Sequence, residues 1–156
     1  RGIYMITLYT RTSNVSSRKA KQWLIDHDIL YDEKKITPQS TWEYEELQKI
    51  LECTENGFDS IISKRSQNYP GNAKINKMST HELLTYLIEH PYLIKFPIII
   101  EHPKLVVGYS EEEIRVFITR EERQMSIFDI TDGLSKCKTL LKTSIDPTTI
   151  TYKVRL

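Results

Sequence analysis

The chain has 156 residues, which favours one domain with a small insertion or tail and is long enough to bury a core without covalent staples. Apolar residues make up 39% and charged residues 28%, as in ordinary globular proteins. Because 22 Lys and Arg balance 21 Asp and Glu, no strong overall field indicates nucleic acid as the direct partner.

The cysteines and the apolar runs exclude several further classes. Cys53 and Cys137 are too few and too far apart for a disulfide framework or a zinc pattern, so we expect two reduced thiols, no metal and no cofactor. A redox switch or a long-range disulfide stays open. No apolar run approaches the roughly 20 residues that span a bilayer. Residues 1–4 lack the apolar stretch of a signal peptide, so we expect a native start at Met5 and a cytoplasmic protein.

The beginning of the chain predicts a βαβ unit. Residues 6–10 alternate as in a strand, and residues 12–17 form a polar loop rich in helix-capping side chains. A helix follows, and a second strand ends near Ile36. The residues that recur at helical spacing are Ala20, Trp23, Leu24 and His27.

The middle of the chain reads as helical. A segment capped by Ser40 or Thr41 is expected to stop at Gly57, which suits a left-handed C-cap, and a short helix begins at Ile61. A third helix is expected from Ser79 to His90, where Pro91 ends it. The first segment's apolar face contains Trp42, Leu47, Ile50 and Leu51, and the last one's contains Leu83, Leu84, Leu87 and Ile88.

The remaining elements are a hairpin, a helix and a tail. Residues 97–101 and 105–109 are predicted to be the two strands of the hairpin. Ser110 opens the helix, which has acidic residues in its first turn. We predict one domain over residues 5–120. For residues 121–156 we expect a C-terminal extension with a helix, to which an edge strand could be added.

Several short segments, in this order, resemble one family. Leu8-Tyr9-Thr10 and Arg18-Lys19-Ala20 open the match, Thr54 to Gly57 lies in its middle, and Phe96 to Ile100 and Val107 to Tyr109 lie near its end. The chain resembles Spx-type proteins, of the arsenate-reductase-like (ArsC) branch of the thioredoxin superfamily, over about residues 5–120. The resemblance implies an α/β, thioredoxin-like fold with a helical insertion.

The resemblance also implies a partner. Spx-type proteins of Gram-positive bacteria bind the C-terminal domain of the RNA polymerase α subunit and redirect transcription under thiol stress. The glycine matching Gly57 lies in that interface, so we expect contacts from Gly57 and its neighbours Asn56 and Phe58. A simple helix stop explains the glycine as well. Trp42 suits either the interface or the core.

The family's redox chemistry is missing from the loop before the first helix. Relatives have one cysteine or a Cys-x-x-Cys pair there, and the matching positions are Asn14 and Ser17. A cysteine at a helix N-terminus becomes a thiolate at neutral pH, whereas a serine hydroxyl ionises on the order of five pKa units higher. Ser17 also lacks a base, since His27 lies about 15 Å along the helix. We therefore expect a degenerate redox loop with Ser17 as a capping or first-turn residue.

A second family feature is also absent. Arsenate-reducing relatives have an arginine before the strand's proline, which is typically cis, and here Phe96 precedes Pro97. Cations remain that could contact an anion or DNA, although a solvated surface explains them equally. They are Arg11, Arg18, Lys64 and Arg65.

These observations favour a regulator over an enzyme. The leading interpretation is an Spx-like protein that binds the polymerase α subunit, contacts promoter DNA only secondarily, and has no small-molecule substrate and no membrane partner. One alternative is an interaction protein with another partner, such as a mimic carried by a mobile element. The other is a divergent arsenate or thiol reductase.

Overall fold

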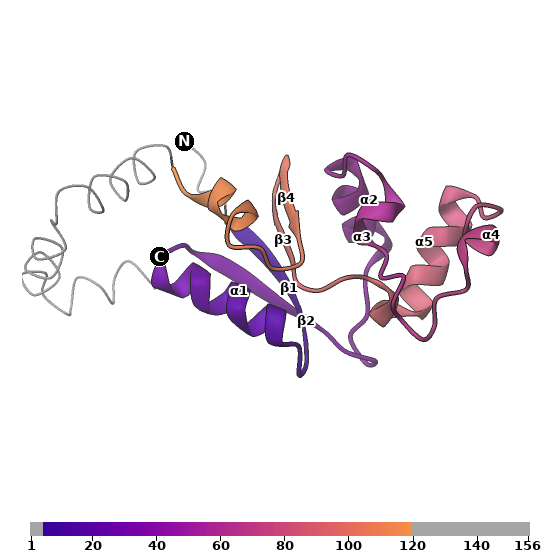
Figure 1. Ribbon diagram of the computed structural model, residues 1–156, viewed down its shortest axis with the longest axis horizontal. Helices are drawn as coiled ribbons and strands as arrows, with labels where there is room; N and C mark the ends of the chain where they lie inside the picture. Colours follow the sequence, from indigo (N-terminus) through magenta and orange to yellow (C-terminus); the bar gives the residue numbers. More distant parts are fainter. Residues whose placement is uncertain (1–4, 120–156) are drawn as a thin grey trace, which may run out of the picture. The chain divides into compact units, whose positions relative to one another are not determined.

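The computed structural model describes residues 5–119, which are coloured in Figure 1. The chain divides after Ile114 into two units, and residues 115–119 are the described part of the second. The predicted extension over residues 121–156, Cys137 and residues 1–4 lie outside the described residues. Among residues 5–119, no helix has the length and apolar character needed to cross a membrane.

A four-stranded sheet in the order β2-β1-β3-β4 organises the first unit (Figure 1). β1 pairs with β2 in parallel, as the predicted βαβ unit requires. β3 pairs antiparallel with both β1 and β4, and the predicted hairpin between β3 and β4 is present. The strands are β1 (Ile6–Arg11), β2 (Tyr31–Ile36), β3 (Ile98–Glu101) and β4 (Lys104–Val107).

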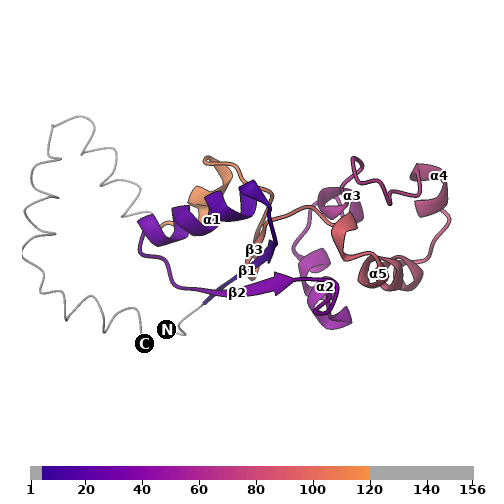
Figure 2. The ribbon, with the colours of Figure 1, turned by 90° about the horizontal axis from the view of Figure 1, so that it is seen from below.

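Two neighbouring residues of β2 show which helix covers which face of the sheet. Glu33 accepts hydrogen bonds from Thr10 of β1 at 2.9 Å and from Lys21 of α1 (Val15–Asp26) at 2.6 Å. Lys34 points to the other face and forms an ion pair with Glu46 of α2 (Tyr44–Glu52). Because side chains alternate along a strand, α1 and α2 contact opposite faces. In Figure 2, α1 accordingly lies along one side of the sheet.

The helical middle begins and turns at different residues from those predicted. Trp42 precedes α2, and Glu43 is the N-cap. Gly57 is the N-cap of α3 (Phe58–Ile61) with φ 57° and ψ −134°, so it begins a helix and is not the predicted C-cap. Ile61 ends α3, although the sequence predicted that a helix starts there. The short α4 (Asn72–Ile75) was not predicted.

The helix predicted from Ser79 is confirmed as α5 (Thr80–Glu89). Ser79 is its N-cap, and its hydroxyl accepts a hydrogen bond from the backbone N–H of Glu82. The Glu82 carboxylate in turn accepts the Ser79 backbone N–H at 2.7 Å, which completes a capping box. Two backbone N–H groups that the helix cannot satisfy internally therefore have partners.

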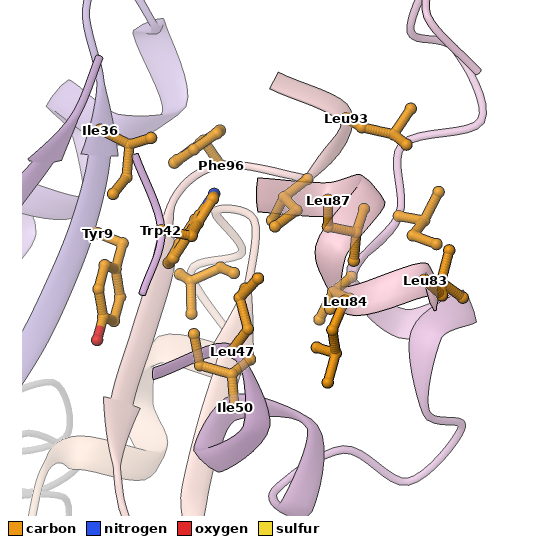
Figure 3. Packing of buried hydrophobic residues seen from close by; sticks show 14 residues of the cluster. Tyr9, Ile36, Trp42, Leu47, Ile50, Leu83, Leu84, Leu87, Leu93 and Phe96 are labelled. Carbon is orange, nitrogen blue, oxygen red and sulfur yellow. The ribbon is translucent and has the colours of Figure 1, made fainter. Parts of the chain in front are cut away.

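The larger core lies between the sheet and the helical middle (Figure 3). Trp42 is 2% exposed, so it is a core residue. Its ring lies 4.8 Å from the ring of Tyr9 and 5.7 Å from that of Phe96, centroid to centroid. Leu47 and Ile50 of α2 and Leu83, Leu84 and Leu87 of α5 complete the packing.

Two 3₁₀ helices complete the described chain. η1 (Pro91–Leu93) follows α5 directly, and η2 (Glu113–Phe117) stands where the sequence predicted an α-helix from Ser110. The peptide bonds before Pro97 and Pro103 are both cis. The cis form at Pro97 agrees with the expectation for this position.

Candidate functional site

The loop between β1 and α1 is closed by the side chain of Asn14. Asn14 is the N-cap of α1, with extended backbone dihedrals, and its Oδ1 accepts a hydrogen bond from the Ser17 backbone N–H at 2.7 Å. An amide at this position thus satisfies one of the free N–H groups of the helix start. The first of the two degenerate positions has a structural role of its own.

Ser17, the second degenerate position, is buried. It is 3% exposed, and its Oγ is 3.5 Å from the Arg11 backbone nitrogen. His27 is the C-cap of α1, stacked on Trp23, with Nδ1 2.8 Å from the Trp23 carbonyl oxygen. The imidazole is therefore held at the opposite end of the helix from the Ser17 hydroxyl, and in the described part of the chain no hydrogen bond joins this hydroxyl to a histidine base.

The segment before the sheet's cis proline is apolar. Phe96 is 8% exposed and stacks on Trp42, so a buried ring occupies the place where the arsenate-reducing relatives were expected to hold an arginine. Lys95 beside it is exposed and donates hydrogen bonds to the carbonyl oxygens of Asp59 at 3.4 Å and Ser60 at 3.1 Å. The nearest cation in sequence therefore binds the backbone of α3.

Two of the predicted anion-binding cations have partners within the fold. The Arg11 guanidinium lies over the ring of Tyr92, 4.1 Å from its centroid, which is a cation–π contact. Lys64 forms an exposed ion pair with Asp59 at 3.3 Å. All four predicted cations are exposed. Their role in binding an anion or DNA stays a prediction.

The loop around Gly57 is open on the surface. Its positive φ with ψ −134° is a combination that only glycine adopts readily, and a Cβ built there meets no atom within 4 Å. Asn56 is exposed, whereas Phe58 is half-buried and packs against the core. The backbone of Gly57 is thus accessible to another molecule, and Phe58 anchors the loop from below.

Cys53 is the cysteine that the described residues contain. It is half-buried at the C-cap of α2. Burial and the neighbouring Glu52 carboxylate raise the pKa of its thiol. The thiol form is therefore favoured over the reactive thiolate at neutral pH. No group of three or more His, Cys, Asp or Glu side chains within residues 5–119 is placed to hold a metal ion.

A groove of about 700 Å³, which the sequence did not predict, lies between α2 and the sheet face that carries Tyr9. Burial and a hydrogen bond to the Glu46 carboxylate raise the pKa of the Tyr9 hydroxyl well above its usual value. Glu46 also forms the ion pair with Lys34, so these groups satisfy one another. The groove forms only where α2 packs against β1 and β3. These elements are distant in the sequence, so no local sequence pattern predicts the groove. Its lining includes Met5, Thr7, Tyr9, Lys34, Glu46, Lys49, Ile50 and Ile100.

The comparisons with known proteins agree on one family. The model of the ArsC family matches residues 9–117. The global transcriptional regulator Spx 2 of Bacillus cereus is 43% identical over 120 residues, which is 76% of this chain and 91% of that protein. The global transcriptional regulator Spx of Staphylococcus aureus is 40% identical over 124 residues, which is 79% of this chain and 94% of that protein.

Solved structures confirm the predicted α/β, thioredoxin-like fold of the ArsC type. A Staphylococcus aureus protein studied by NMR in solution superimposes with a TM-score of 0.63 at 22% identity, covering 72% of this chain and 97% of its own. An arsenate reductase of Vibrio cholerae superimposes with a TM-score of 0.55 at 17% identity, covering 74% and 96%. At such identities the likeness concerns the fold alone.

Proposed function

The chain belongs to the ArsC family, and from this premise we propose that it is a cytoplasmic transcriptional regulator of the Spx type. It binds the C-terminal domain of the RNA polymerase α subunit and acts without a redox switch in its first loop. The observation that carries the proposal is its similarity to the Spx regulators over nearly their whole length. No small-molecule substrate is part of this function.

The chemistry of the first loop supports a regulator without redox control. A reductase of this family needs a thiolate at the start of α1, and Asn14 and Ser17 supply an amide and a hydroxyl instead. Asn14 already caps the helix, and the Ser17 hydroxyl is buried without a base. Phe96 cannot hold an oxyanion as an arginine would.

The partner surface that we propose is the loop of Asn56, Gly57 and Phe58. Gly57 is half-buried, but the open space at its Cβ position allows close approach of another chain, and Phe58 fixes the loop to the core. Promoter DNA is a secondary contact in this proposal. Its ligands are the exposed cations Arg11, Arg18, Lys64 and Arg65.

Binding to the isolated C-terminal domain of the α subunit tests the proposal. Titration calorimetry should detect a complex with the full chain and a loss of affinity of tenfold or more for Gly57→Arg. Gly71→Arg is the matched control, because Gly71 also has a positive φ and open space around its Cβ position. The two variants share the conformational cost, so only the position differs.

The outcomes separate the alternatives. If neither the wild type nor the Gly71→Arg variant binds the α subunit, the chain is an interaction protein with another partner. Equal losses in both glycine variants would place the interface elsewhere. Arsenate or disulfide reduction that persists after Cys53→Ser and Cys137→Ser would make the protein an enzyme and overturn the interpretation of the loop.

A further inference from the structure

The short helix α3 follows the loop around Gly57, and its C-terminal end is capped by one distant residue. α3 consists of four residues, and Gly57 is its N-cap. The carbonyl oxygens of its last three residues all accept hydrogen bonds from Lys95. The ammonium donates to Asp59 at 3.4 Å and to Ser60 at 3.1 Å. The backbone N–H of Lys95 donates to Ile61 at 2.7 Å. These carbonyl groups are the ones that a helix end cannot satisfy internally.

A helix as short as α3 needs contacts with the rest of the fold to keep its place. A single helical turn is unfavourable in an isolated chain, because several backbone dihedrals are fixed for very few hydrogen bonds. Here the Ile62 N–H donates to the Phe58 carbonyl oxygen at 2.9 Å, and the Ser60 N–H donates to that of Gly57 at 3.2 Å. The Phe58 ring packs against the core and fixes the first residue of the turn. The last residues depend on the segment that contains Lys95.

The segment that contains Lys95 is anchored on both sides. Ile94 and Phe96 are 2% and 8% exposed, and the Phe96 ring stacks on that of Trp42 (Figure 3). Ile94 also forms an antiparallel bridge with Ile62, the residue directly after α3. The backbone of Lys95 is therefore fixed between two buried residues, while its exposed side chain reaches α3. The hydrogen bonds of Lys95 thus attach α3 to a firmly packed part of the fold.

The ammonium group of Lys95 suits this position. Lysine side chains can bond to the last carbonyl oxygens of a helix, and a charged donor forms a stronger hydrogen bond than a neutral one. Within residues 5–119, no carboxylate forms an ion pair with Lys95, and its ammonium is directed at Asp59 and Ser60. An apolar side chain of similar length would leave both carbonyl groups without this donor.

We propose that Lys95 is a positioning residue for partner binding, which keeps α3 in the place from which the Gly57 backbone meets the partner. This inference rests on the proposed function, because it takes the loop around Gly57 as the interface. Lys95 was not among the expected contacts of that interface. It acts through α3 and does not itself touch the partner.

Two measurements on Lys95→Met test this assignment, since methionine keeps an unbranched stem and the backbone N–H but has no ammonium. In the free chain, hydrogen exchange followed by NMR should become about two- to tenfold faster at the Ser60 and Ile62 amides, the range for one net hydrogen bond. The amides of α5 should exchange as before. The affinity for the α-subunit domain, from calorimetry, should fall by about twofold or more, because only molecules with a correctly placed loop can bind.

Two further variants complete the test. Lys95→Arg should restore both the exchange rates and the affinity, because a guanidinium also donates to carbonyl oxygens. Lys35→Met is the matched control, since it removes one exposed ammonium outside the helical middle, and it should change neither quantity. A loss of affinity with unchanged exchange in Lys95→Met would mean that Lys95 contacts the partner directly. Faster exchange with full affinity would mean that the cap contributes to stability alone. Either result would overturn the assignment.

The exchange measurement keeps this inference apart from the proposed function. It uses the full chain without a partner, so it reports on the cap of α3 whether or not the α-subunit domain binds. A wild type that does not bind that domain would contradict the proposed function and, with it, the positioning role. A wild type that binds, together with unchanged exchange and affinity in Lys95→Met, would overturn the positioning role alone.

Discussion

At the scale of single residues, the start of α1 shows an amide with a structural role at a position where the family resemblance implies a redox cysteine. The Asn14 amide oxygen caps the helix through the Ser17 N–H at 2.7 Å. An amide is among the best N-cap groups, whereas a thiol is a weak acceptor. The loop therefore gains a hydrogen bond at a position where its relatives were expected to have a reactive sulfur.

Asn14→Ala should destabilise the protein by about 1 kcal/mol, because an N–H at the helix start loses its partner. The free energy of unfolding, from urea titration followed by circular dichroism, measures this change. Asn14→Asp is the control and should keep most of the stability, since a carboxylate also caps and is favoured at a helix N-terminus. An alanine variant as stable as the wild type would contradict the role of the cap.

Cys53 should react slowly with thiol reagents in the folded protein. Burial and Glu52 raise the pKa of its thiol, so the thiolate that reacts is scarce near neutral pH. In a Cys137→Ser background, modification by a disulfide reagent at pH 7.5 should be slower in the native protein than in urea. Equal rates in the two states would show that Cys53 is an accessible, reactive thiol.

At the scale of elements, α5 was the clearest local signal. The Ser79 and Glu82 pair predicts the capping box, and the structure contains both of its hydrogen bonds. The role of Gly57 was harder to predict, because a lone glycine after a helical pattern can either end one helix or begin the next. The distinction depends on the turn through residues 53–57, which has no periodicity to read.

The candidate site was predictable in part. Asn14 and Ser17 were identified from their alignment with a family motif, and the structure adds that Asn14 is the cap and that Ser17 is buried. The Arg11–Tyr92 contact could not be predicted, because these residues are far apart in the sequence and only the tertiary structure brings them together. The same holds for the groove beside Tyr9.

The capping box should make α5 sensitive to acid. Hydrogen bonds from the backbone and side chain of Ser79 lower the pKa of Glu82. A carboxyl whose pKa is lower in the folded state stabilises the fold fully above its unfolded pKa of about 4.3, and this stability is lost as the pH falls through the folded value. Glu82→Gln should therefore lose less stability between pH 5 and 3 than the wild type in urea titrations. Parallel pH profiles would contradict this contribution.

Trp42 should be the most costly aromatic residue to remove from the helical middle. It is 2% exposed and contacts the rings of Tyr9 and Phe96, so Trp42→Ala leaves a large cavity and should cost about 3–5 kcal/mol. Tyr44→Ala, only two residues away but 37% exposed, is the control and should cost less than half as much. Comparable unfolding free energies for the two variants would contradict the packing described.

At the scale of the whole molecule, the near-neutral net charge does not show how the individual charged groups are used. Glu33 and Lys34 bind α1 and α2 on opposite faces of the sheet. Burial raises the pKa of Glu33, but hydrogen bonds from Lys21 and Thr10 outweigh it and lower the pKa overall. These charges form ion pairs that join helices to the sheet, whereas within residues 5–119 the exposed Arg65, Lys74 and Lys77 form no ion pair. Some charged groups thus attach helices to the sheet, and others contribute only to the charge of the surface.

Partner binding by the whole protein should be unaffected by oxidants. If the first loop has no redox switch, the affinity for the α-subunit domain should be the same after treatment with diamide as after treatment with dithiothreitol. Asn14→Cys/Ser17→Cys is the informative comparison. The two substituted residues stand three positions apart at the start of α1, where the Asn14 side chain of the wild type reaches the Ser17 backbone N–H. The substitution removes the amide cap in both redox states, but only the oxidised variant has a bond that ties the two positions together, so its affinity should depend on the oxidant. A wild-type protein that changes affinity on oxidation would place a working thiol switch at Cys53 or Cys137.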